Sequence, residues 1–269
     1  MPELPEVAAL AGFLREHLVG SRIVGIELEE YGALKTRDRS LDELAGRTVS
    51  GIRRFGKHVA IDTDGPSLVV GFGRAGWMAW PDADAADGAA PVIARMALES
   101  GAVLQITDAG AWLSLTLSVA DDAGALPALA KLGPDPASAD YATEDLDRVL
   151  VGRRKQLKAL LQEQESLAGI GNAYSDEILH AARLWPLTHA ADLDAGQRAS
   201  LYEAMRGELA AAFRAREGVP IDQLKARKVA AMRVHGRRGA PCPVCGNTVA
   251  DLPGSKGAAQ YCPTCQPEP

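Results

Sequence analysis

The four cysteines of the chain have the most specific spacing of any residues that could do chemistry. Two residues separate Cys242 from Cys245, two separate Cys262 from Cys265, and sixteen lie between the pairs. This C-x₂-C…C-x₂-C spacing is typical of a tetrahedral zinc site made of thiolates. Two disulfides are the alternative, but disulfides are rare in the cytoplasm. We therefore predict a zinc ribbon with one structural ion, because four protein ligands leave no open position for catalysis.

The N-terminus combines a potential nucleophile with carboxylates. Pro2, Glu3 and Glu6 precede or begin a segment whose apolar residues recur at helical spacing, which predicts a helix over residues 5–18. Proline and glutamate at a helix start are also what capping and the helix dipole select. Taken alone, capping is the simpler explanation of this segment.

A second segment could bind an anion. Residues 167–174 read Leu-Ala-Gly-Ile-Gly-Asn-Ala-Tyr and lie between two predicted helices. The glycines let the backbone approach a ligand, the next helix starts with unpaired N–H groups, and Asn172 adds a side-chain amide. A tight helix–helix turn explains the same residues, and for the loop in isolation that reading is favoured.

The positive charge of the chain is unevenly distributed. The net charge is −6, yet residues 44–61, 153–158 and 223–250 contain basic residues and no acidic ones. Any one of these runs can be an ordinary solvated face. Three of them in an acidic chain favour a molecule with one basic face, which suits a polyanionic partner.

The hydrophobic pattern predicts an α+β fold with two kinds of layer. Short alternating runs predict an antiparallel β-sandwich with strands at residues 22–28, 48–55, 58–62, 67–72, 94–98, 103–107 and 112–117. A polar loop at 81–91 interrupts them, and a proline-containing linker at 132–139 follows. Helices are predicted at 145–150, 155–164, 173–182 and 196–217. We expect three domains: 1–133, 134–230 and 231–269.

The chain carries no signal for a membrane. No apolar run approaches the roughly 20 residues that span a bilayer. The N-terminus has glutamates where a signal peptide has basic residues. A cytoplasmic protein without membrane contact is expected.

Four segments, in the same order along the chain, resemble the formamidopyrimidine-DNA glycosylase and endonuclease VIII family. The start Met-Pro-Glu-Leu-Pro-Glu-Val resembles that family's N-terminus, and Arg53-Arg-Phe-Gly-Lys57-His resembles its lysine loop. Gly169-Ile-Gly-Asn172-Ala-Tyr-Ser-Asp-Glu177 resembles its helix–two-turn–helix motif, and the cysteine ribbon resembles its zinc finger. The Pro-Glu-Leu-Pro-Glu start favours the formamidopyrimidine branch.

The resemblance implies a bifunctional DNA glycosylase and abasic-site lyase of base excision repair. Once Met1 is removed, the secondary amine of Pro2 would attack the sugar of a damaged nucleotide and form a Schiff base. Glu3 would move protons at the sugar and the leaving group, and Glu6 would shape the same pocket. Lys57 would pair with a phosphate and assist proton transfer.

The implied partner is damaged double-stranded DNA, bound by a monomer. Lys158 and Asn172 would hold phosphates beside the extruded nucleotide, with Tyr174 in the same motif. Arg74 stands where the branch has a methionine that fills the gap left by that nucleotide. Lys256 stands beside Gly257, near the place of the family's phosphate-binding arginine.

Departures from the family pattern concern how a lesion is read. The gap-filling arginine and phenylalanine that would precede Gly110-Ala-Trp112 are missing, and no histidine lies between His58 and His180. We expect oxidised purines such as 8-oxoguanine and formamidopyrimidines as default lesions, with choice altered toward bulky alkylated purines, crosslinks or lesions in single strands. The alternatives are a catalytically silent protein that binds damaged DNA on this scaffold, and a zinc-ribbon protein unrelated to repair.

Overall fold

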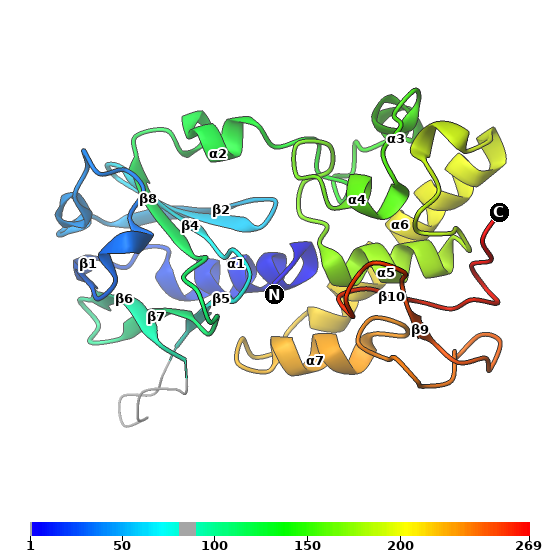
Figure 1. The fold of residues 1–269 in the computed structure, drawn as a ribbon. Helices are drawn as coiled ribbons and strands as arrows, with labels where there is room; N and C mark the ends of the chain where they lie inside the picture. The colour runs from blue at the N-terminus through cyan, green and yellow to red at the C-terminus, as the bar shows by residue number, and fades with distance from the viewer. Residues whose placement is uncertain (1, 81–89) are drawn as a thin grey trace. The chain divides into compact units, whose positions relative to one another are not determined.

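The computed structural model describes residues 2–80 and 90–269. The chain divides into two compact units, Met1–Lys131 with Gly218–Leu224 and Leu132–Glu217 with Lys225–Pro269 (Figure 1). The short segment Gly218–Leu224 thus belongs to the first unit although it follows most of the second in sequence. The predicted α+β class is confirmed, and the division into three domains stays a prediction.

The first unit begins with helix α1, Leu4–Leu18. Val7, Leu10, Leu14 and Leu18, the residues that predicted a helix here, are all fully buried. Their spacing places them on one face of the helix, and that face packs into the core of the unit. The chain leaves the helix through Gly20, whose φ of 85° is a conformation that glycine adopts without strain.

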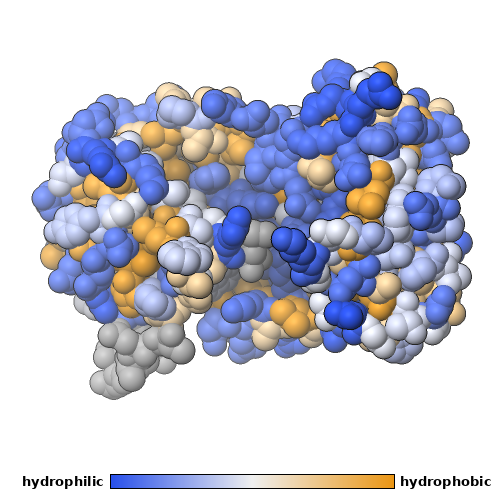
Figure 2. All heavy atoms as spheres, viewed as in Figure 1, coloured by the Kyte–Doolittle hydropathy of each residue, from blue (hydrophilic) through white to orange (hydrophobic). Residues whose placement is uncertain are grey.

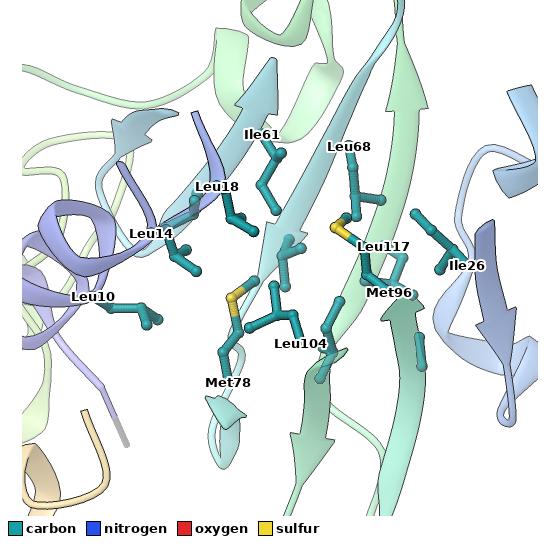
Figure 3. Packing of buried hydrophobic residues seen from close by; sticks show 14 of the residues in the cluster. Leu10, Leu14, Leu18, Ile26, Ile61, Leu68, Met78, Met96, Leu104 and Leu117 are labelled. Atoms are coloured by element: carbon teal, nitrogen blue, oxygen red, sulfur yellow. The ribbon is translucent and has the colours of Figure 1, made fainter. Parts of the chain in front are cut away.

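Two antiparallel four-stranded sheets follow α1. In the first sheet the order is β1 (Ile23–Leu28), β6 (Val92–Leu98), β7 (Val103–Asp108) and β5 (Gly76–Ala79). In the second it is β2 (Val49–Phe55), β3 (His58–Thr63), β4 (Ser67–Gly71) and β8 (Thr116–Ala120). Apolar side chains from both sheets and from α1 form one core, part of which Figure 3 shows. Short helical turns at Tyr31–Ala33, Leu41–Leu44, Ala123–Ala125 and Pro127–Ala130 (α2) complete the unit.

The predicted strand at 112–117 is wrong in its first half. Residues 109–115 form a turn, and β8 starts only at Thr116, because the Asp108 carboxylate binds backbone N–H groups of this turn. The pattern also missed β5, since the chain reverses at Gly73 with a φ of 52°. The loop predicted at 81–91 lies mostly outside the described residues.

The second unit is helical and ends in the cysteine ribbon. Its helices are α3 (Thr143–Leu150), α4 (Leu157–Leu161), α5 (Asn172–Ala181), α6 (Ala195–Arg216) and α7 (Leu224–Ala231), with a short turn at Ala190–Asp192. Two short strands, β9 (Ala250–Asp251) and β10 (Gln260–Tyr261), form the ribbon hairpin. The predicted helix at 155–164 is shorter than expected, and α7 was not predicted. The α7 segment is rich in basic residues, and its apolar residues do not recur at a clear helical spacing.

The helices of both units can be compared with what a membrane span requires. Among the described residues, no helix combines the length and the apolar character that crossing a bilayer requires. On the face drawn in Figure 2, hydrophilic residues surround smaller groups of hydrophobic ones on both units.

Candidate active site and metal centre

Glu3 and Glu6 interlock at the start of α1. Both residues are only 1% exposed. The Glu3 N–H donates to Glu6 Oε2 at 3.1 Å, and the Glu3 side chain accepts from the backbone of Glu6 in a capping box. Because Glu6 binds the peptide that joins Pro2 to Glu3, it holds both residues in place. The capping role considered from the sequence is therefore present, and the catalytic role expected for Glu6 stays a prediction.

The contacts of α1 place its N-terminal end toward the same end of the first unit as the Lys57 turn. The helix runs against β2 in the opposite direction: Gly20 N–H donates to Val49 O at 2.9 Å, and Arg15 Nη2 to Ile52 O at 3.1 Å. From Arg15 back to Glu3 the helix rises about 18 Å. From Ile52 to Phe55, where β2 ends, the strand advances about 10 Å, and the turn that carries Lys57 follows directly. Glu3 and Lys57 thus lie at the same end of the unit, toward which α1 and the β2–β3 hairpin both point (Figure 1).

Two further turns join the Lys57 turn at this end. The Phe72 N–H, directly after β4, approaches Lys57 O at 3.5 Å. The exposed Arg74 donates its backbone N–H to Ser114 Oγ at 2.8 Å, which ties the 73–75 turn to the 109–115 turn. Pro2, Glu3, Lys57 and Arg74 are therefore gathered at one end of the first unit.

His58 is a half-buried base next to Lys57 that the sequence did not single out as functional. A Cβ placed on Gly71 would lie 2.7 Å from its ring, so only glycine leaves room for the imidazole. Burial lowers the pKa of His58; the Phe55 carbonyl at 3.3 Å opposes this, and the charge of Lys57 adds to it. The ring is therefore held neutral at pH 7.

This burial predicts a loss of stability in acid. Because the pKa of His58 is lower in the folded protein than its ordinary value of about 6.5, the unfolded chain binds more protons in that range. The contribution of His58 to the free energy of unfolding is thus full above pH ~6.5 and lost as pH falls through the folded pKa. Urea titrations between pH 7.5 and 5 should show a shallower pH dependence for His58→Gln than for the unchanged protein. Equal slopes would contradict the assignment.

In the second unit, Asn172 links the start of α5 to the ribbon hairpin. Its Nδ2 donates to Ala258 O at 2.5 Å, and Gln162 Nε2 donates to its Oδ1 at 3.4 Å. The loop before it requires glycine at Gly169, where φ is 95°. The predicted phosphate-binding amide therefore lies between the helix and the hairpin that carries Lys256, an exposed residue with a φ of 51°.

Lys158, which packs against α5, and Tyr174, which belongs to α5, both lie inside the protein. Lys158 is 8% exposed, and its Nζ donates to Asn172 O at 3.1 Å, Ser175 Oγ at 2.9 Å and Asp176 Oδ1 at 2.5 Å. Tyr174 is 2% exposed, with Lys228 Nζ 5.0 Å from its ring centroid. Both side chains are therefore bound within the protein, and Lys158 ties α4 to the first turns of α5. Their predicted contacts with DNA stay predictions.

Two buried carboxylates on α5, which the sequence analysis missed, attach the ribbon. Glu177 accepts three backbone N–H groups, those of Arg233 at 3.0 Å and of Val234 and His235 at 2.9 Å each. Asp176 accepts from His235 Nδ1 at 2.7 Å. The only sequence signal was a pair of adjacent acids in a helix with a buried face. They hold residues 233–235, which lead into the ribbon, because without these carboxylates buried N–H donors would have no acceptor.

The four cysteines meet at one point and could hold a metal ion. Their sulfur atoms all lie within 4.8 Å of one another, with 3.8 Å between Cys242 and Cys265 and 3.4 Å between Cys245 and Cys262. These separations are far longer than a disulfide bond of about 2.05 Å. Burial and the neighbouring sulfurs raise the pKa of Cys265 to about 12, while the backbone N–H of Asn247 lowers that of Cys245 to about 7. Four thiolates cannot lie this close together without repelling one another, and a bound cation would offset that repulsion.

Much of the positive charge that the sequence grouped into basic runs is paired within the protein. Arg153 and Lys155 both contact Glu163, at 2.7 and 2.5 Å, and hold its pKa at about 2. Further pairs include Arg53 with Asp62, Lys158 with Asp176, Arg233 with Glu177 and Glu208, and Arg238 with Asp251. The runs therefore give a weaker basic face than their composition indicates.

The chain matches two family models. The formamidopyrimidine-DNA glycosylase N-terminal domain matches residues 1–112, and the formamidopyrimidine-DNA glycosylase H2TH domain matches residues 132–221. A formamidopyrimidine-DNA glycosylase of Heliobacterium modesticaldum is 32% identical over 99% of this chain and 100% of its own length. An uncharacterized formamidopyrimidine-DNA glycosylase-like protein of Mycobacterium tuberculosis is 45% identical over 50% of this chain and 84% of its own length.

Solved structures agree with these matches. The Lactococcus lactis formamidopyrimidine-DNA glycosylase in complex with DNA containing FAPY-dG has a TM-score of 0.87 and 26% identity, covering 99% of this chain and 100% of its own. The same enzyme in complex with tetrahydrofuran-containing DNA and an inhibitor has a TM-score of 0.88 at 26% identity, with the same coverage.

Proposed function

The chain belongs to the formamidopyrimidine-DNA glycosylase family, and from that premise we propose that it is a bifunctional glycosylase and abasic-site lyase that acts through Pro2. The observation that carries the proposal is the placement of the buried Glu3 next to Pro2, at the end of the first unit where the Lys57 turn also lies. A nucleophile, a proton-transferring carboxylate and a phosphate-binding cation are what the reaction needs.

The reaction follows from the chemistry of a secondary amine. An α-amino group titrates near pH 7.7–8.0, so a useful fraction of the Pro2 amine is neutral at pH 7 once Met1 is removed. Its lone pair forms a bond to C1′, and the C1′–base bond breaks with its electron pair leaving on the base, which Glu3 helps to protonate. The nitrogen then loses its proton, and its lone pair breaks the C1′–O4′ bond of the sugar ring, with Glu3 delivering a proton to O4′. The product is an iminium, which acidifies the C2′ proton. Loss of that proton expels the 3′ phosphate and cleaves the strand.

Damaged double-stranded DNA is the proposed partner of the monomer. Lys57 and Arg74 would contact it from the first unit, and Asn172 and Lys256 from the second. For Lys158, beneath α5, and for Tyr174, in α5 itself, we propose a positioning role, because their side chains are buried and bound within the protein. The silent DNA-binding protein remains the alternative, and it would bind the same DNA without forming a covalent bond.

We propose oxidised purines as the main substrates. We also propose that lesion choice is altered toward bulky alkylated purines, crosslinks or lesions in single strands. A panel of duplexes with 8-oxoguanine, formamidopyrimidine, bulky alkylated purine or crosslink, and of single strands, tests both proposals when product and borohydride-trapped adduct are measured together. Excision with trapping on any substrate supports the enzyme. Good excision of 8-oxoguanine with no cutting or binding of the bulky alkylated, crosslinked or single-stranded substrates would overturn altered choice. Tight binding to damaged duplex without product or adduct would support the silent protein instead.

A structural zinc ion is the proposed occupant of the cysteine centre. Four sulfurs around a tetrahedral zinc at 2.3 Å lie about 3.8 Å apart, close to the 3.8 and 3.4 Å found here. His180 Nε2, on α5, lies 3.3 Å from Cys242 Sγ, so its N–H can donate to that thiolate and tie the ribbon to the helix. The fully protein-made ligand set supplies folding stability to the ribbon and no catalytic water.

The His180 contact predicts a measurable effect on zinc retention. His180→Ala should release zinc to a chelating dye about 10–100-fold more readily, because an outer hydrogen bond to a ligand is lost. His180→Gln can still donate a hydrogen bond, so its rate of zinc release should lie between those of His180→Ala and the unchanged protein. His189→Ala, a change at an exposed histidine of the same unit, is the control. Release that is unchanged in His180→Ala would rule out the contact as a support of the site.

A further inference from the structure

The 109–115 turn presents an unusually exposed tryptophan. Trp112 is 86% exposed and the next residue, Leu113, is 40% exposed. Tryptophan is highly buried on average, so an indole left in water at a turn tip calls for an explanation. The other three tryptophans of the chain, Trp77, Trp80 and Trp185, are partly or fully buried.

The turn that carries Trp112 is held rigidly. The carboxylate of Asp108 accepts the N–H groups of Gly110 at 2.8 Å, Ser114 at 2.8 Å and Leu115 at 2.9 Å. Burial acts to raise the pKa of Asp108, but these hydrogen bonds outweigh it and hold that pKa below its usual range. A Cβ placed on Gly110 would lie 2.9 Å from Trp112 O, so only glycine fits beside it. The indole is thus presented on a preorganised support.

The surroundings of Trp112 match a polyanion with apolar bases. The 73–75 turn, which carries the exposed Arg74, is bound to the same turn through Ser114 Oγ at 2.8 Å. These turns lie at the end of the unit that also holds Pro2, Glu3 and Lys57. An aromatic ring and a cation carried by two hydrogen-bonded turns can stack on a base and bind a nearby phosphate.

We propose that Trp112 inserts into the base stack of duplex DNA at the gap left by the extruded nucleotide, with Arg74 on the flanking strand. The inference rests on the DNA-binding part of the proposed function, because only a protein that extrudes a nucleotide creates such a gap. Extrusion breaks two stacking contacts, and an inserted apolar side chain restores part of them. Trp112 then takes the place of the family's missing gap-filling residues, from a turn too short for an arginine–phenylalanine pair.

The test uses binding alone, so that it is independent of the Schiff base. The DNA is a duplex with a tetrahydrofuran abasic analogue, which has no base to expel, and with 2-aminopurine next to it as a fluorescent reporter of stacking. Trp112→Ala should bind this duplex about 10–100-fold more weakly and lose the reporter change. Trp112→Phe should retain most of both. Val24→Ala, which removes an exposed apolar side chain from β1, should behave as the unchanged protein.

Comparison with a single-stranded abasic analogue completes the design. There the gap lacks an opposing strand, so Trp112→Ala should lose much less affinity than on the duplex. Equal affinity and equal reporter change for Trp112→Ala and the unchanged protein would overturn the inference. So would an equal loss on single strands and duplex, which would indicate a general contact with bases. If the reporter responds to Trp112 while no lesion gives a trapped adduct, the inference holds and the lyase function fails.

Discussion

A protein that keeps a residue ahead of Pro2 is expected to lose the covalent adduct with DNA. Acylation turns the proline nitrogen into an amide, whose lone pair is delocalised and cannot attack C1′. We expect trapping to fall by at least about 10³-fold. Pro2→Gly, which leaves a primary amine, should weaken trapping less severely. The measurement is borohydride trapping on a duplex with a preformed abasic site.

Pro5→Ala is the matched control for this prediction. It changes the other proline of the N-terminal segment, in the first turn of α1, while the terminal amine stays available. It should trap DNA at close to the normal rate, with at most a small loss of stability. Full trapping by the N-terminally extended protein would show that another amine, such as that of Lys57, is the nucleophile.

Glu3→Gln is expected to separate base excision from attack on an abasic site. Glutamine keeps the shape and can still accept the capping hydrogen bond, but it cannot transfer a proton. Excision of a damaged base should fall about 10²–10⁴-fold. Trapping at a preformed abasic site should persist, because no base has to be protonated there.

Glu6→Gln is the matched comparison, since both glutamates are buried and both take part in the capping box. Its side chain can still accept the Glu3 N–H, so activity should stay within about 10-fold of normal. Equal losses of excision in the two variants would contradict the separate roles of a proton-transferring Glu3 and a positioning Glu6. The structure assigns Glu6 contacts that fit positioning, whereas the sequence placed it in the catalytic pocket.

Local periodicity and motif spacing predicted much of this molecule. The apolar spacing of Val7, Leu10, Leu14 and Leu18 predicted α1, because those side chains share one helical face. The cysteine spacing predicted the cluster of sulfurs, since each pair lies in a tight turn. The α+β class followed from the change of period after Gly20.

Features that depend on contacts distant in sequence could not be predicted. The 109–115 turn depends on a carboxylate that captures N–H groups up to seven residues away, which no period reveals. Asp176 and Glu177 look like solvated helix residues until their partners at 233–235 are placed. The basic runs looked exposed because their acids, such as Glu163, lie elsewhere in the sequence.

Mass spectrometry of the trapped adduct tests the central claim most directly. The protein is incubated with damaged duplex, reduced with borohydride and digested with nuclease and protease. The peptide that carries the nucleotide remnant is then sequenced. Attack by the N-terminal amine predicts the added mass on the nitrogen of Pro2, in a peptide that lacks Met1. A remnant on Lys57 or another lysine, or excision of the base with no adduct at all, would contradict it.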